Sequence, residues 1–86
     1  MFEQTQLTPI LRKREVIKLF GFSNSTFYDR INKGEMTPGI SLGGRAVGWP
    51  ENELDTIQKA MIAGYSQDQL KELVSQLIEQ RTNPIN

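Results

Sequence analysis

The sequence of 86 residues contains neither cysteine nor histidine. The chain therefore has no disulfide, no thiol nucleophile, no imidazole base and no soft ligand for a metal. We expect no enzyme and no cofactor. No apolar run approaches the roughly 20 residues that span a bilayer, and the N-terminus lacks the pattern of a secretory signal. These absences favour a cytoplasmic protein without a membrane span, built as one small domain.

The formal net charge of zero conceals an uneven distribution along the chain. Residues 1–49 carry seven Lys and Arg against four Asp and Glu, a net charge of +3. Residues 50–86 carry three against six, a net charge of −3. Such asymmetry indicates that one half of the protein faces an anionic partner.

The stretch from Gly21 to Gly34 predicts a sharp turn followed by a short helix. Gly21 suits the left-handed position after a helix end, and Ser23 is a good N-cap. Phe27 and Ile31 lie four residues apart, so they share one face and can anchor the helix on a core. The remaining positions are mostly polar. Such a helix is typical of one that enters a DNA groove, although an ordinary surface helix has the same pattern.

A first helix is predicted over residues 13–20, with Val16 and Phe20 on its apolar face. Arg12-Lys13-Arg14 stand at its start, where cations oppose the helix dipole. This local conflict indicates another role for the triplet, such as phosphate contact, with a solvated basic patch as the alternative. The two helices and the tight turn between them form a helix-turn-helix.

A β-hairpin is predicted next, because apolar residues alternate on both sides of a Gly-rich loop. With a four-residue loop, Leu42 faces Val47 and Ile40 faces Trp49, and all four side chains pack inward. A two-residue turn at Gly43-Gly44 keeps the same inward set. Arg45 then stands at the tip with no apolar neighbour. A cation on such a wing suits contact with the DNA backbone or minor groove, and a solubilising charge is the alternative.

A third helix is predicted from Pro50 to about residue 63. Glu51, Glu53 and Asp55 in its first turns complement the helix dipole, which explains them better than a metal site does. A capping box, Ser66 to Gln69, then opens a last helix over about residues 67–81.

The last helix carries one apolar stripe with spacings of 3, 1, 3 and 1. Soluble monomers usually avoid exposing such a patch, so it must pack on the chain's own core or on another copy. We favour self-association over internal packing. The residues of the stripe are Leu70, Leu73, Val74, Leu77 and Ile78.

The order of these elements resembles the AlpA-type regulators of phages and prophages, over Leu11 to about Ile57. The residues that carry the resemblance are Glu15-Val16, Gly21–Tyr28, Gly34, Leu42–Trp49 and Glu53-Leu54. The resemblance implies a MerR-like winged helix, related to phage excisionases. It also implies a sequence-specific DNA-binding protein of a mobile element, acting on a promoter or directing excision.

The predicted fold class is mainly α with a small β-hairpin: a winged helix-turn-helix with an extra C-terminal amphipathic helix. Its parts are a flexible arm (1–9), the DNA-binding domain (10–63), the C-terminal helix (64–82) and a tail (83–86).

The predicted partner is double-stranded DNA, with no membrane partner. Further partners are a second copy, as a homodimer through the C-terminal helix, and an integrase or polymerase. The rival hypothesis is a protein-interaction module that docks through the C-terminal helix without DNA binding. The predicted DNA-binding residues are Arg12, Lys13, Arg14, Asn24, Ser25, Thr26, Tyr28, Arg30, Lys33 and Arg45.

Overall fold

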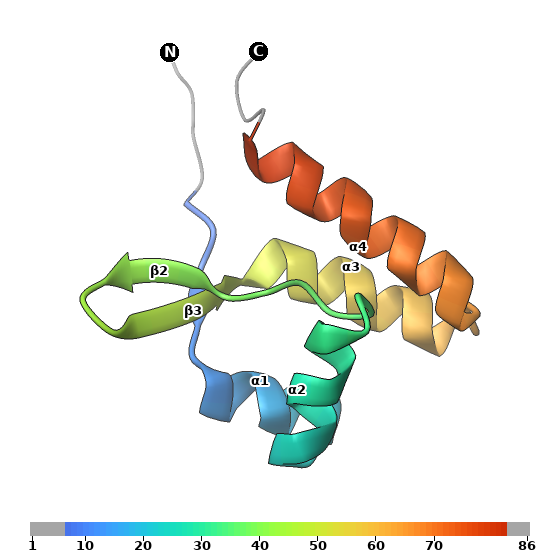
Figure 1. Cartoon of the computed structure of the whole chain (residues 1–86), viewed down its shortest axis with the longest axis horizontal. Coiled ribbons are helices and arrows are strands. Elements are labelled where there is room, and N and C mark those ends of the chain that lie inside the picture. Colours follow the sequence, from blue (N-terminus) through green and yellow to red (C-terminus); the bar gives the residue numbers. More distant parts are fainter. Residues whose placement is uncertain (1–6, 83–86) are drawn as a thin grey trace.

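The computed structural model describes residues 7–82, which form four helices and three short strands (Figure 1). It confirms the predicted fold class, a winged helix-turn-helix with an added C-terminal helix. The predicted tail and most of the predicted N-terminal arm lie outside the described residues. The elements are β1 (Ile10–Leu11), α1 (Lys13–Phe20), α2 (Asn24–Asn32), β2 (Ile40–Gly43), β3 (Ala46–Pro50), α3 (Glu51–Ile62) and α4 (Gln67–Thr82).

The turn between α1 and α2 forms as its residues predict. Gly21 adopts φ 70°, and the N–H of Phe22 donates to the carbonyl of Ile17 at 3.1 Å. This closes the end of α1 in the manner of a Schellman motif. Ser23 then caps α2, because its hydroxyl accepts the N–H of Thr26 at 3.1 Å.

The strands form a sheet in the order β1-β3-β2, so β3 lies at its centre. Leu11 of β1 lies opposite Trp49, and Ile10 lies opposite Pro50. The sequence did not predict β1, because two residues are too few to show a period. Its pairing with β3 holds the chain just before α1 against the hairpin.

The predicted register of the hairpin is wrong. The turn consists of Gly44 and Arg45, and the register between Ser41 and Gly43 shifts at a bulge. Ser41, not Leu42, therefore lies opposite Val47. A bulge adds one residue to one strand, and this changes which side chains point inward. Leu42 therefore lies on the face of the hairpin opposite to Trp49 and is 44% exposed. Val47 shares the face of buried Trp49, as predicted, but is 41% exposed near the hairpin tip.

The core gathers around Phe27 and Trp49, whose rings meet edge-on at 5.1 Å between centroids. All four helices reach it, together with the connector that follows α2. The buried members of this cluster are Val16, Phe27, Met36, Trp49, Leu54, Ile57, Val74 and Leu77.

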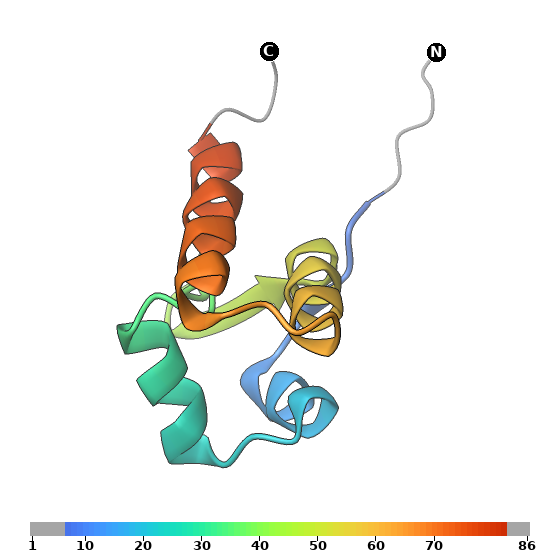
Figure 2. The same cartoon turned by 90° about the vertical axis from the view of Figure 1, so that its right-hand side faces the viewer.

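Helix α4 packs on the chain's own core, which corrects the prediction that its apolar stripe is free for self-association. Leu70, Val74 and Leu77 are buried, whereas Leu73 is partly buried and Ile78 is 37% exposed. Figure 1 shows α4 running back over α3 in roughly the opposite direction, as an antiparallel return in a monomer requires, and Figure 2 shows the same two helices from the side. In this position it covers both α3 and the connector.

The connector between α2 and β2 contains buried residues that α4 helps to cover. Glu35, Met36 and Thr37 are only 3%, 1% and 0% exposed, although they belong to no helix or strand. Met36 shares its cluster with Val74 and Leu77 of α4. Apolar residues of α3 alone do not cover this segment, so the stripe that we assigned to a second copy completes the monomer's core.

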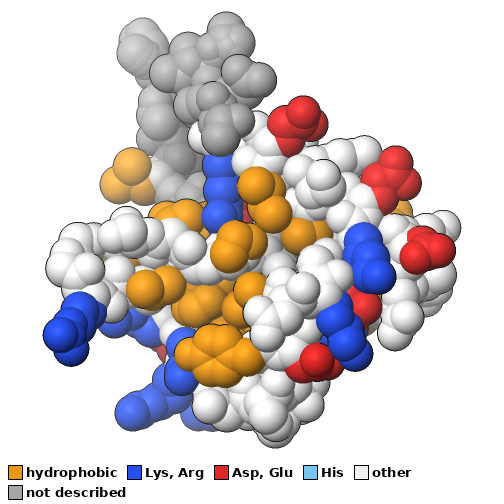
Figure 3. Space-filling view, in the orientation of Figure 1, with side chains coloured by type: hydrophobic (Ala, Val, Ile, Leu, Met, Phe, Trp, Pro, Cys, Tyr) orange, Lys and Arg blue, Asp and Glu red, His pale blue; other side chains and the backbone are white. Residues whose placement is uncertain are grey.

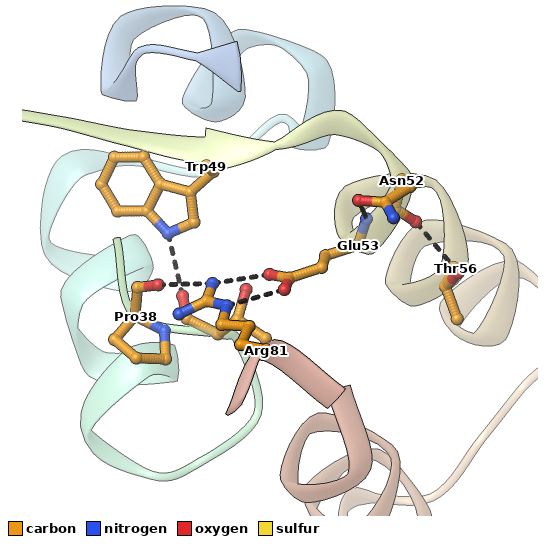
Figure 4. A network of polar contacts seen from close by, with 7 residues as sticks. Pro38, Trp49, Asn52, Glu53, Thr56 and Arg81 are labelled. Carbon is orange, nitrogen blue, oxygen red and sulfur yellow. Dashed lines mark hydrogen bonds and ion pairs between the residues drawn. The ribbon is translucent and has the colours of Figure 1, made fainter. Parts of the chain in front are cut away.

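A buried ion pair fixes the C-terminal end of α4 (Figure 4). The guanidinium of Arg81 donates to both carboxylate oxygens of Glu53, at 2.7 and 2.6 Å, and to the carbonyl of Pro38 at 2.9 Å. The two side chains are 20% and 7% exposed. A two-pronged contact of this kind fixes orientation, so Arg81 joins α4 to α3 and to the connector.

Replacing Leu77 by Glu should destabilise the folded monomer, because the new carboxylate would enter the core. The loss should exceed the about 2–5 kcal/mol of truncating a buried Leu. Urea unfolding would measure it, with Gln76→Glu, on the exposed side of α4, as the control. A dimeric wild type that Leu77→Glu converts to a stable folded monomer would restore the self-association hypothesis.

Replacing Arg81 by Met should cost about 3–5 kcal/mol of unfolding free energy, because Glu53 would remain buried without its partner. The double variant Glu53→Met/Arg81→Met should recover most of this loss. Lys71→Met, on an exposed position of α4, serves as the control. Equal stability of the single and double variants would show that the pair does not hold α4.

Candidate nucleic-acid interface

A groove of about 910 Å³ lies between the start of α1, the outer face of α2 and the hairpin. Figure 3 shows apolar side chains in the middle of this face, with Lys and Arg side chains at its left and lower edges. Five of the predicted DNA-binding residues line the groove, although they come from three separate segments of the chain: Arg12, Lys13, Arg14, Tyr28 and Arg45.

Lys13 and Tyr28 form one unit across the two helices of the helix-turn-helix. The ammonium of Lys13 donates to the hydroxyl of Tyr28 at 3.2 Å and lies 5.0 Å from the centre of its ring. The Tyr28 side chain is 46% exposed, so it is available for contact. An ammonium and a phenol hydroxyl presented together suit a phosphate or a base edge.

Arg12 has a structural contact in addition to its predicted role. Its Nε donates to the carbonyl of Val47 at 2.9 Å, and its backbone N–H donates to the carboxylate of Glu15 at 3.0 Å. The first contact ties the start of α1 to β3. The second places an acid in the first turn of α1, which offsets the basic triplet there.

Arg14 and Arg45 are exposed, like Arg12, and also line the groove. Within residues 7–82, neither side chain has an ion-pair partner. Arg45 stands in the hairpin turn, and Gly43 before it has φ 105°, which an L side chain rarely adopts. The turn therefore projects a cation beyond the sheet, as the sequence predicted for a wing.

The first turn of α2 carries the next set of predicted contacts, outside the groove lining. Asn24, Ser25 and Thr26 are all exposed. The hydroxyl of Ser23 donates to that of Thr26 at 2.8 Å and lies 3.4 Å from that of Ser25. These side chains form a polar tip on α2 that can reach base edges.

Arg30 and Lys33 already have carboxylate partners, which the sequence analysis missed. Arg30 donates to Glu35 at 3.3 Å, and the Glu35 side chain is only 4% exposed. Lys33 pairs with Asp29 at 3.0 Å, on the exposed surface. The spacing of Asp29 and Lys33 on one helix could have indicated their pair. Neither cation is as available for phosphate as Arg14 or Arg45.

The charge asymmetry of the sequence becomes a separation in space. In Figure 3, most acidic side chains lie on the right, over the C-terminal helices, and the cations of the groove lie on the left and below. Glu53 leaves this acidic surface because it points inward to Arg81. The face that carries the groove is therefore locally basic.

The comparisons with known proteins identify the family. The family model described as "Prophage CP4-57 regulatory protein (AlpA)" matches residues 9–60, more than half of the chain. The chain belongs to the AlpA family. It is also 46% identical over 54 residues to "Uncharacterized protein ORF88" of Enterobacteria phage P4. This match covers 63% of the present chain and 61% of that relative, so the chain spans less than two thirds of its length. No solved structure matches the chain.

The AlpA match confirms the resemblance seen in the sequence and assigns the chain to a family of phage regulatory proteins. It includes the helix-turn-helix, the hairpin and most of α3, and it ends before α4. All the residues of the groove fall inside it. Among the described residues, no helix has the length and apolar character needed to cross a membrane.

Tyr28→Ala should leave the fold intact, whereas Phe27→Ala should remove much of its stability. Phe27 is 0% exposed, and losing a buried Phe costs about 3–5 kcal/mol, a large share for a small domain. Thermal unfolding followed by circular dichroism would compare the two variants. If Tyr28→Ala melted the domain and Phe27→Ala did not, the orientation of α2 would be wrong.

Proposed function

We propose that this protein binds double-stranded DNA sequence-specifically, as a regulatory protein of a mobile element. The observation that carries the proposal is the groove, in which cations from α1 and the hairpin flank the exposed Tyr28 of α2. Membership of a family of phage regulators supports it. The absence of His and Cys from the sequence removes the commonest catalytic groups.

Helix α2 would lie in the major groove and read base edges with its first turns. Asn24 can bond adenine through both groups of its amide, while Ser25 and Thr26 can contact bases or phosphates. Tyr28 follows one turn later, with Lys13 held against it. Phe27 faces the core and holds the helix in place.

Phosphate contacts would come from the two sides of the groove. Arg14 and Lys13 stand at the start of α1, and Arg45 stands at the hairpin tip. Arg12 supports the hairpin through Val47 and can contribute its remaining N–H groups. We place Arg30 and Lys33 second, because they already pair with Glu35 and Asp29.

One such module buries roughly 600–1,000 Å² on DNA, so a single copy should bind weakly. Specific binding would then use several copies on adjacent sites, with bending of the DNA where the sequence permits it. Regulation of a promoter and direction of excision would use the same protein–DNA contacts.

The rival hypothesis, docking through the α4 stripe without DNA binding, needs an exposed apolar stripe, and most of this stripe is not exposed. Leu70, Val74 and Leu77 are buried in the monomer. Pairing of copies through α4 would be left with Ile78 and the exposed part of Leu73.

The proposal is tested by fluorescence anisotropy with duplexes that tile the DNA beside the gene, across a salt series. At least one duplex should bind more tightly than a shuffled duplex of equal composition. The logarithm of its binding constant should fall linearly with the logarithm of salt concentration. Equal binding to all duplexes, or none to any, would refute a sequence-specific DNA-binding function.

Arg45→Ala should weaken DNA binding and reduce the salt slope by about 0.9, because one phosphate contact disappears. The fold should not change, since Arg45 is exposed in a turn. Lys59→Ala removes the same charge from α3, outside the groove lining, and should leave the slope unchanged. Equal effects of the two substitutions would show that the hairpin tip makes no specific contact with DNA.

A further inference from the structure

We propose that the groove between α2 and the hairpin holds the sugar–phosphate backbone of one DNA strand, with its apolar floor against the deoxyribose. The inference rests on the proposed function and deepens it. It makes the groove the place where the protein distinguishes a deoxyribose from a ribose.

The floor of the groove is apolar although its edges are cationic. Val47 and Tyr28 are 41% and 46% exposed, and they lie beside the almost fully buried Trp49. Gly39 completes the floor, because a Cβ there would collide with Val47 and approach Trp49 to 3.0 Å. An exposed apolar floor between cations is suited to a ligand that has both apolar and anionic parts.

The edges supply the charge complementarity. Lys13 and Arg14 stand on the α1 side of the groove, and Arg45 stands at the hairpin tip. The one carboxylate of the lining, Glu15, accepts the backbone N–H of Arg12 at 3.0 Å. Cations on two sides of an apolar floor match a strand in which a phosphate lies on each side of every sugar.

The position of the groove selects the backbone over a base. With α2 in the major groove and the hairpin tip reaching beyond it, the feature of the DNA that passes between them is the ridge of one strand. A base edge would meet the polar tip of α2 instead, at Asn24 and Ser25. The side chain of Val47 therefore faces sugar carbons.

A ribose would fit this floor poorly. Its 2′-hydroxyl would lie against the methyl groups of Val47 and the ring of Tyr28, where it would lose its bonds to water. Burying a hydroxyl without a partner is unfavourable, and the 2′-hydroxyl is the group by which proteins tell RNA from DNA.

The test is a scan of the bound duplex with single ribonucleotides, placed at each position of each strand in turn. Affinity for the full-length protein should fall about 5- to 30-fold at one or two adjacent positions of a strand, and less than about 2-fold elsewhere. A flat scan on a duplex that binds normally would overturn the groove assignment and leave the proposed function standing. Failure of the all-DNA duplex to bind would overturn both.

A matched pair of variants assigns the effect to the floor. Val47→Thr keeps the shape of the side chain and adds a hydroxyl that can partner the 2′-OH, so the loss at the sensitive positions should shrink at least about 3-fold. Leu42→Thr makes a similar change on the same hairpin, at a residue of similar exposure outside the groove lining, and should leave the scan unchanged. The opposite pattern would overturn the assignment.

Contact of the floor with thymine methyl groups is the competing arrangement. Replacing individual thymines by deoxyuridine removes those methyls and leaves every sugar intact. An affinity loss from these replacements that Val47→Thr abolishes, together with a flat ribonucleotide scan, would place Val47 on bases and overturn the proposal.

Discussion

The packing of Trp49 is the constraint on which the rest of the fold depends. Its ring lies edge-on to Phe27 of α2 at 5.1 Å, and its Nε1 donates to the carbonyl of Thr37 at 2.8 Å. It stands on the central strand, opposite Leu11 of β1. One side chain therefore holds the hairpin, the candidate recognition helix and the connector in fixed relation, which a two-sided DNA contact requires.

The parts of the fold that the sequence predicts well are those set by local chemistry. Gly21 and Ser23 end one helix and begin the next through their own backbone and hydroxyl groups. The register of the hairpin could not be predicted in this way. A single bulged residue on β2 changes which β2 side chains point inward, and the alternation of apolar residues in the sequence does not reveal it. The α4 stripe shows that a helix should pack but not on what. It packs on α3 and on a buried connector without regular structure, and no periodic pattern exists for the connector.

The sequence was sufficient to name the cations of the candidate site, but it did not reveal the apolar floor between them. Arg14, Arg45 and Tyr28 could be named because exposed charges and a Gly-rich tip are visible in the sequence. Val47 lies on the same face as Trp49, as predicted, but the bulge places Ser41 rather than Leu42 opposite it, and this neighbour could not be read from the sequence. The ion pair of Arg30 was not predicted because its partner, Glu35, lies five residues on, beyond the end of α2. Local rules fail most often at functional sites, and the bulge lies in the hairpin that borders the candidate site.

The net charge of zero does not oppose the proposed contact with DNA, because the two signs are separated. The described chain extends over 41 × 29 × 19 Å. In Figure 3 the cations of the groove and most of the acids lie toward opposite ends of the longest axis. At physiological ionic strength, exposed charges are largely screened beyond about 8 Å. A DNA strand at the groove would therefore meet a basic surface, while the acids of α3 and α4 act mainly on solvent. Helix α4 lies beyond the AlpA match. Its Arg81 and its apolar stripe pack on the core, and none of its acidic residues lines the candidate groove.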